Sequence, residues 1–223
     1  MQAVQDRAQS ALREAVLNYD VDGAIKAAQD TVTAGADPVK AIEEGLSKAM
    51  KTVGDRFEAG EVFLTELMIA AEAMKQAIAI LKPAISKGST KMREPLGKVL
   101  IGTVEGDIHD IGKNLVGTML TVAGFEIVDL GADVLTKTFI EKAKEVRPDI
   151  LGMSALLTTT MARMPEVMAG LEKEHLRREV KVMVGGTPVS EAWAKEIGAD
   201  GYAAEALGAV AVARQNLNKR SPN

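Results

Sequence analysis

The chain has 223 residues, of which 26% are charged and 47% hydrophobic, and its formal net charge is −4. These proportions are ordinary for a globular protein long enough to bury one large core or two smaller ones. Cysteine is absent, which excludes disulfides, thiolate metal sites and a cysteine nucleophile. The acidic balance and the 3% of aromatic residues argue against a nucleic-acid surface, and no apolar run is long enough to cross a bilayer. We therefore expect a cytoplasmic protein that binds neither nucleic acid nor membrane.

Residues 1–90 have the composition of a helical bundle. Ala, Leu, Glu, Lys and Met dominate them, and runs of β-branched residues are missing. Asp37-Pro38 is typical of a helix start, with the aspartate as N-cap and the proline in the first helical position. Helical periodicity predicts further helices over residues 3–18, 21–34 and 61–80. We therefore expect a four-helix bundle domain over residues 1–90.

The limits of the later helices are predicted from glycine and proline. Gly54 and Gly60 are expected to bracket a break before the long helix, and that helix is expected to end near Pro83. Methionines at helical spacing are assigned to the core of the bundle, namely Met50, Met68 and Met74.

Residues 86–96 are small, polar and charged, which predicts a linker, placed at residues 91–96, before a second domain at residues 97–223. In this second domain short apolar runs alternate with helical segments. The predicted strands lie at residues 98–103, 126–130, 150–153, 180–184 and 201–203. The alternation predicts an α/β domain with a doubly wound, five-stranded parallel sheet of Rossmann-like or flavodoxin-like type. The carboxyl ends of its strands share one edge, where open α/β sheets bind ligands.

The loop after the first predicted strand carries one of the chain's two histidines. It reads Glu-Gly-Asp-Ile-His-Asp-Ile-Gly over residues 105–112, so His109 follows Asp107 at a spacing of two. An imidazole that binds a metal through one ring nitrogen needs a partner for the other, and a carboxylate at this spacing can provide it. The second histidine, His175, lies in a run of charged residues and is assigned no function.

Three later loops at the same edge also have an unusual composition. The third strand runs into a Ser/Thr-rich segment that ends at Thr160, the fourth ends in Gly185-Gly186, and the fifth contains Tyr202. Taken singly, such loops are usually helix caps or tight turns. Their joint occurrence at one sheet edge favours a ligand site instead.

The spacing Asp107-x-His109-x-x-Gly112 resembles the cobalamin-binding motif of corrinoid-dependent methyltransferases. Nearly the whole chain resembles the corrinoid-binding modules of cobalamin-dependent methionine synthase and of the methylamine, methanol and betaine methyltransferase systems. The resemblance implies a bound cobalamin, as methylcobalamin or a Co(I) corrinoid, with His109 as the lower axial cobalt ligand. Asp107 and Thr160 would stand behind His109 in a hydrogen-bonded relay, and these three residues would have the catalytic role.

The resemblance also implies which residues contact the cofactor. Ser154, Leu156 and Thr158 match the segment that lines the buried nucleotide tail, and Gly185-Gly186 matches the glycines that let the tail pass close to the backbone. The implied contacts of the α/β domain are Glu105, Gly106, Asp107, His109, Asp110, Ile111, Gly112, Ser154, Leu156, Thr158, Gly185, Gly186 and Tyr202.

The helical domain carries a second part of the resemblance. Residues 53–64 are similar to the helical cap that covers the upper face of the corrin in methyl carriers, although Thr65 stands where a proline is common. By this resemblance Phe57, Leu64 and Leu67 would shield the methyl group on the cobalt. The implied function is a methyl shuttle between a substrate-specific methyltransferase and an acceptor methyltransferase that acts on a thiol or a tetrahydropterin. A reductive activase would restore oxidised cobalt.

Three other functions stay open from the sequence. The small subunit of an adenosylcobalamin mutase would share the histidine loop but would not need residues 1–90. A cobalamin-dependent sensor or regulator would normally add a DNA-binding module, and no basic helix-turn-helix segment is visible. A nucleotide-binding domain would need a phosphate-binding glycine fingerprint, which Gly106 and Gly112 do not supply.

Overall fold

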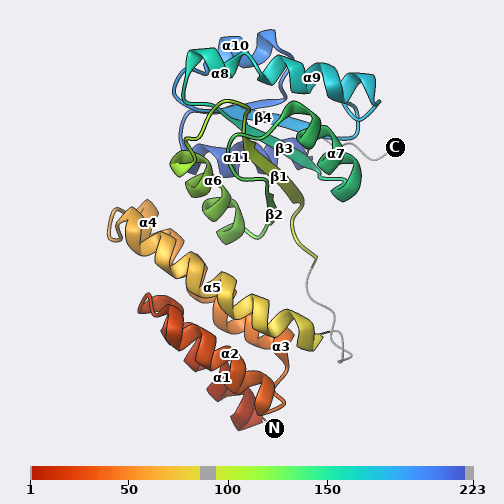
Figure 1. Ribbon diagram of the computed structural model, residues 1–223. Coiled ribbons are helices and arrows are strands. Elements are labelled where there is room, and N and C mark those ends of the chain that lie inside the picture. The colour runs from red at the N-terminus through yellow and green to blue at the C-terminus, as the bar shows by residue number, and fades with distance from the viewer. Residues whose placement is uncertain (1, 86–93, 219–223) are drawn as a thin grey trace. The chain divides into compact units, whose positions relative to one another are not determined.

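The computed structural model describes residues 2–85 and 94–218 (Figure 1). The chain divides into two compact units, Met1–Glu94 and Pro95–Asn223. Residues 91–93 of the predicted linker lie outside the described residues, so the predicted domain limits stay a prediction. Each unit buries its own set of hydrophobic residues.

The first unit is entirely helical in its described part. Its helices pack in four runs, with α2 against α1 and α5, and with the third run against α1. The elements are α1 (Gln2–Leu17), α2 (Val21–Thr33), a third run of α3 (Pro38–Lys40), the π-helical η1 (Ala41–Ser47) and α4 (Lys48–Glu58), and then α5 (Leu64–Ile85). The predicted start of the third run is confirmed, because the Asp37 carboxylate accepts hydrogen bonds from the N–H groups of Val39 and Lys40.

The later helices differ from the prediction at their ends. Gly54 is buried inside α4, which continues to Glu58. The helical run is interrupted only at Gly60, whose positive φ of +74° is typical of a residue that follows a helix. The long helix α5 begins at Leu64 and not at residue 61, because the Glu66 carboxylate accepts the N–H of Phe63 at 2.8 Å and so caps that first turn.

One core assignment was wrong. The described part of α5 runs through Pro83 to Ile85, and residues 86–93 lie outside the described residues, so the predicted end of this helix near Pro83 stays a prediction. Met50 and Met74 are buried as predicted, whereas Met68 is exposed. Met68 lies off the buried stripe of α5, which contains Leu67 and Ala70.

The second unit contains the predicted parallel sheet. Its strands are β1 (Lys98–Thr103), β2 (Glu126–Asp129), β3 (Ile150–Ser154), β4 (Lys181–Gly185) and β5 (Gly201–Ala203). All pairings are parallel and the strand order is β2-β1-β3-β4-β5. The fold class predicted from the sequence is therefore confirmed.

Helices cover both faces of this sheet (Figure 1). They are α6 (Ile111–Val122), α7 (Thr136–Val146), α8 (Thr158–Met161), α9 (Met164–Lys173), α10 (Glu191–Glu196) and α11 (Ala206–Asn218). Consecutive strand residues enter opposite cores: Val99 packs with the residues of α6 and α11, and Leu100 with those of α7, α9 and α10. This alternation follows from the period of two along a strand.

The order of the strands creates a switch point beside β1. The chain leaves β1 through α6 toward β2, and it returns from β2 to β3 through α7 on the opposite face. The loops that follow β1 and β3 therefore diverge at the carboxyl ends of these two neighbouring strands. Such a point is where open α/β sheets bind ligands.

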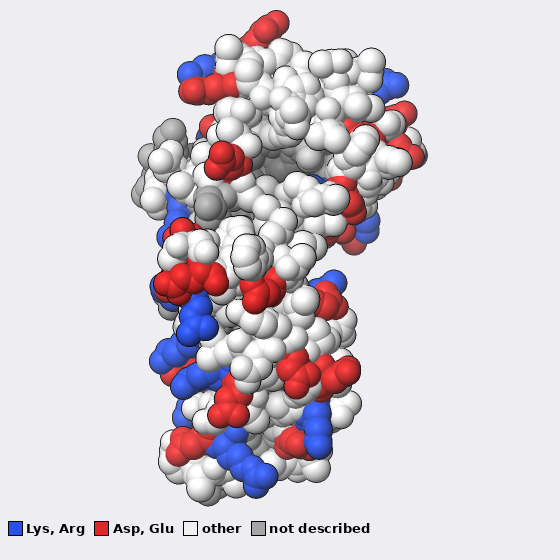
Figure 2. Space-filling view, turned by 90° about the vertical axis from the view of Figure 1, so that its left-hand side faces the viewer, with Lys and Arg blue, Asp and Glu red and all other residues white. Residues whose placement is uncertain are grey.

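Surface charges do not gather by sign on the face of the molecule drawn in Figure 2, where acidic and basic side chains are intermixed. Among the described helices, none combines the length and the apolar character needed to span a membrane.

Gly186, just beyond β4, is required by the chain's own backbone. Its φ is +115°, and a Cβ at this position would lie 1.9 Å from the carbonyl oxygen of Ala155. The neighbouring loops are held this close because Ser154 pairs with Gly185 and the N–H of Ala155 donates to the Gly185 carbonyl. A side chain here would disrupt the sheet edge whether or not a cofactor is bound.

We predict that Gly186→Ala lowers the free energy of unfolding by at least about 2 kcal/mol, because the substitution combines backbone strain with steric overlap. The control is Gly208→Ala in α11, where no atom lies within 4 Å of the new Cβ and the φ is ordinary. This second change should be neutral or stabilise by up to about 1 kcal/mol. Chemical denaturation of both full-length variants measures the difference, and equal stabilities would contradict the prediction.

Candidate functional site

A buried carboxylate, that of Asp107, organises the loop after β1. Its Oδ1 accepts hydrogen bonds from the backbone N–H and from the Nδ1 of His109, at 3.0 and 2.8 Å. Its Oδ2 accepts the Thr160 hydroxyl at 2.6 Å. The backbone N–H groups of Leu156 and Leu157, in the loop after β3, also donate to Oδ2, at 2.7 and 3.3 Å. Asp107 thus joins the two loops that diverge at the switch point.

These hydrogen bonds keep Asp107 ionised. Burial by itself raises the pKa of a carboxyl group, but donation from Thr160, Leu156 and His109 outweighs it and holds the pKa of Asp107 well below its usual range. An ionised carboxylate can only accept hydrogen bonds. The Nδ1 of His109 must therefore carry the proton that it shares with Asp107.

The His109 ring offers its other nitrogen outward. The side chain is 46% exposed, and with Nδ1 protonated, a neutral ring has its lone pair on Nε2, directed away from Asp107. A histidine oriented by a carboxylate in this way is the usual form of a metal-binding histidine. Within residues 2–85 and 94–218, this site included, no group of three or more His, Cys, Asp and Glu side chains is placed to hold a metal ion.

The loop after β1 is also held by hydrogen bonds with the loop that follows β2. The N–H of Gly106, whose φ is +82°, donates to the Asp133 carboxylate at 2.7 Å. The N–H of Asp133 in turn donates to the backbone carbonyl of Asp107, and the Thr103 hydroxyl donates to that of His109. The backbone around the histidine is thereby fixed by neighbours far apart in the sequence.

Exposed apolar side chains surround this loop. Ile108 and Ile111 flank His109 and are 75% and 72% exposed. Leu135, Leu156 and Leu157, on the neighbouring loops, are also exposed. Large apolar side chains held in water beside a polar site are typical of a surface that a ligand covers. Sequence analysis singled out Ile111 and Leu156 but missed Ile108, Leu135 and Leu157, although apolar residues in loops at the carboxyl edge were a usable signal.

The remaining sequence-predicted residues of the second unit lie in different environments. Glu105, Asp110 and Gly112 belong to the histidine loop and the start of α6, and Thr158 is exposed at the start of α8. Ser154 and Gly185 are paired at the ends of β3 and β4. The partly buried Tyr202 packs against the core beneath α7, α9 and α10. Its predicted contact with a cofactor stays a prediction.

The three predicted cap residues belong to the first unit. Phe57 and Leu64 are half-buried, and Leu67 is completely buried in the helical core. Phe63, which the sequence analysis did not select, is 77% exposed. The shielding role of Phe57, Leu64 and Leu67 stays a prediction.

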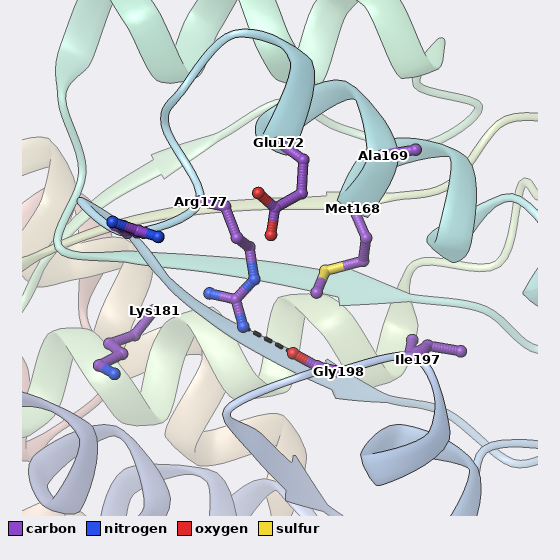
Figure 3. Close-up of a pocket in the computed structure, with 8 residues that line it drawn as sticks. Met168, Ala169, Glu172, Arg177, Lys181, Ile197 and Gly198 are labelled. Carbon is purple, nitrogen blue, oxygen red and sulfur yellow. Dashed lines mark hydrogen bonds between the residues drawn. The ribbon is translucent and has the colours of Figure 1, made fainter.

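A separate surface hollow of about 530 Å³ lies at the opposite, amino edge of the sheet (Figure 3). Arg177 donates a hydrogen bond to the Gly198 carbonyl at 2.6 Å and forms an ion pair with Asp200 at 2.8 Å. Lys181 also pairs with Asp200. These basic groups are satisfied within the protein. None of the sequence-predicted site residues lines this hollow.

Comparison with known proteins identifies the family. Residues 97–211 and residues 8–82 match two sequence families, each described as a B12 binding domain. Trimethylamine corrinoid protein 2 of Methanosarcina acetivorans is 49% identical over 89% of this chain and 91% of its own length. The dimethylamine corrinoid protein of Methanosarcina barkeri is 47% identical over 92% of this chain and 99% of its own.

A solved structure agrees with this relationship. The structure of a methanol:cobalamin methyltransferase complex from Methanosarcina barkeri contains a chain that superposes with a TM-score of 0.84 at 29% identity. The match covers 97% of this chain and 82% of that one. The histidine loop, the doubly wound sheet and the helical unit occur together in this family. This chain therefore belongs to the B12-binding corrinoid proteins, and its cofactor is a corrinoid.

Proposed function

We propose that this protein is a methyl carrier that holds its corrinoid through His109 and passes a methyl group between two methyltransferases. The observation that carries the proposal is the pair of Asp107 and His109. A buried, ionised carboxylate holds the proton on Nδ1 and directs Nε2 toward solvent, at the switch point of the sheet and among exposed apolar side chains.

The residues at this edge fit a corrinoid. The corrin ring would itself hold the cobalt, so the protein would need to offer only one ligand, which Nε2 of His109 could supply. Ile108 and Ile111 offer apolar surface for the ring. By the family resemblance, Ser154, Thr158 and Gly185 would line the path of the nucleotide tail. When bound, the corrinoid supplies a cobalt nucleophile that accepts and releases the methyl group.

The chain's own residues would set the state of His109 as a ligand. Asp107 holds the ring of His109 in one tautomer, and the Thr160 hydroxyl and the loop after β3 keep Asp107 ionised. The pKa of Asp107 is held well below its usual range, so its carboxylate stays an acceptor for the Nδ1 proton. An Nε2 that carried a proton would have no lone pair to offer a metal, so protonation of this pair would favour the ligand-free state.

The partners are inferred from chemistry and from the relatives. The names of the similar proteins favour a methylated amine as the first donor and a substrate-specific methyltransferase as the first partner. The chain has no cysteine with which to build a thiolate zinc site that activates an acceptor. We therefore propose a second methyltransferase for a thiol or tetrahydropterin acceptor, and a reductive activase for oxidised cobalt.

The ligation can be tested by electron paramagnetic resonance of the full chain loaded with hydroxocobalamin and reduced to Co(II). We expect nitrogen splitting that changes when the protein contains isotopically labelled histidine and that is lost in His109→Ala. His175→Ala, which removes the other histidine, should keep the splitting. A splitting that instead follows a label in the cofactor's benzimidazole would contradict the assignment of His109.

The state of Asp107 predicts how stability depends on pH. Because the pKa of Asp107 is lowered by folding, its ionised form favours the folded state at neutral pH. This contribution is lost as the pH falls below about 4, the ordinary range of an aspartate, toward the lowered value. Asp107→Asn should be less stable at neutral pH, by roughly 1–3 kcal/mol. The reason is that the NH2 group of the new amide would face buried N–H and O–H groups that also donate.

The measurement is urea denaturation of both proteins, without cofactor, from neutral to acid pH. The difference in stability between the wild type and Asp107→Asn should shrink as the pH falls. If the stabilities of the two proteins stayed a constant distance apart over the whole pH range, folding would not lower the pKa of Asp107.

The carrier role predicts that the methyl-loaded protein transfers its methyl group only when a methyltransferase is added. Phe57→Ala should speed light- or oxidant-driven loss of the methyl group with little change in cofactor retention, and Phe57→Leu should preserve the protection because it keeps apolar bulk. Absorption spectroscopy follows both losses. Full transfer by the protein alone, or DNA binding that depends on light or cobalamin, would overturn the carrier role.

A further inference from the structure

A buried lysine lies in the first turn of α6, directly after the histidine loop. The Lys113 side chain is 1% exposed, and its ammonium contacts both oxygens of the Asp129 carboxylate at 2.7 and 2.6 Å. Its third partner is the side-chain oxygen of Asn114 at 2.7 Å. A cation in the first turn opposes the helix dipole, and its burial is costly unless it is paired. Local stability alone therefore does not account for this residue.

The ammonium fixes the orientation of the neighbouring amide. Lysine can only donate, so the Oδ1 of Asn114 must face Lys113 and the Nδ2 must face away. That Nδ2 donates to the Asp110 carboxylate at 3.0 Å, and the backbone N–H of Asn114 donates to the Asp110 carbonyl at 2.7 Å. Asp129, Lys113, Asn114 and Asp110 form one chain of contacts, which we call the α6 relay.

The α6 relay changes what Asp110 does. Asp110 is the N-cap residue of α6, a position where an aspartate normally accepts a hydrogen bond from the N–H groups of the first turn. Here its side chain makes no capping hydrogen bond and is bound by Asn114 instead. The carboxylate next to His109 in the sequence is therefore held by a side chain rather than by the helix that it begins.

We propose that Lys113 and Asn114 are positioning residues for His109. Besides the contacts of Asp133 and Thr103 described above, the loop after β1 is held by one carboxylate on each side of the histidine. Asp107 ties it to the loop after β3, and the α6 relay ties Asp110 to Asp129 at the end of β2. This inference rests on the proposed function, because it gives the α6 relay a role only if His109 is the cobalt ligand.

Removal of the relay should displace the histidine without unfolding the protein. In Lys113→Met the freed Asp129 carboxylate is hydrated, since its side chain is already 42% exposed. Asn114 then loses the contact that fixes its amide, and Asp110 becomes free to cap α6. The backbone of residue 110 moves with it, so Nε2 of the adjacent His109 leaves the position in which it binds the cobalt.

The test compares variants of the full chain, loaded with hydroxocobalamin and reduced to Co(II), by electron paramagnetic resonance. The readout is the ratio of histidine-bound to histidine-free cobalt, together with stability in urea. Lys113→Met and Asn114→Leu should each lower this ratio about fivefold, the effect of one neutral hydrogen bond. The double variant should fall no further, because both residues act through one chain of contacts. Lys142→Met, which breaks an exposed ion pair with Glu145 on α7, is the control and should leave the ratio unchanged.

Each result counts for or against the α6 relay. A fall in Lys113→Met without one in Asn114→Leu overturns the relay, and so do variants that lose stability while the ratio stays at the wild-type value. Should Lys113→Met fail to fold, Asn114→Leu still decides the question, because it retains the pair of Lys113 with Asp129. A wild-type protein without splitting from its own histidine would overturn the proposed function, and this inference with it.

Discussion

The ionised carboxylate of Asp107 is the interaction on which the site depends. A buried carboxyl group without donors becomes neutral, and a neutral acid can donate a proton to the imidazole instead of accepting one. The donors that prevent this come from Leu156, Leu157 and Thr160, about 50 residues away in the sequence. The loop after β3 thus decides which nitrogen of His109 carries the proton. The hydroxyl of Thr160 makes the shortest of these hydrogen bonds, at 2.6 Å.

The strand order makes this arrangement possible. In the order β2-β1-β3 the central strand has a neighbour on each side, so the loop after β1 can be held from both. The contacts of Asp107 lie toward β3, and those of Asp133 and the α6 relay come from the end of β2 and the loop behind it. On an edge strand the loop would have one neighbour only. The switch point therefore provides both the space for a ligand and the rigidity of the ligating side chain.

Some apolar residues of the helical unit are buried and others are exposed, and only those with exposed surface are available to shield a cofactor. Leu67 and Ala70 belong to the buried stripe of α5, which holds this unit together. The exposed apolar side chains of the same region are Phe63, Met68 and Ile69. Phe63 precedes the helix, and Met68 and Ile69 lie outside the stripe because the helix turns about 100° per residue. The apolar surface that this part of the unit offers to a cofactor or partner is therefore mainly theirs.

The sequence by itself determined the helical and α/β regions, the five strands and the position of the histidine loop. These features depend on periodicity and on local spacing, which one chain displays directly. It misplaced the break at Gly54, the start of α5 and the burial of Met68, because caps and helix packing decided them. Only the tertiary structure showed that the Ala155 carbonyl leaves no room for a side chain at Gly186, and that Ile108, Leu135 and Leu157 are exposed in the loops at this edge. It also decided the partners of Asp107 and Lys113, because these contacts join loops from different strands, and no local pattern records which strands become neighbours.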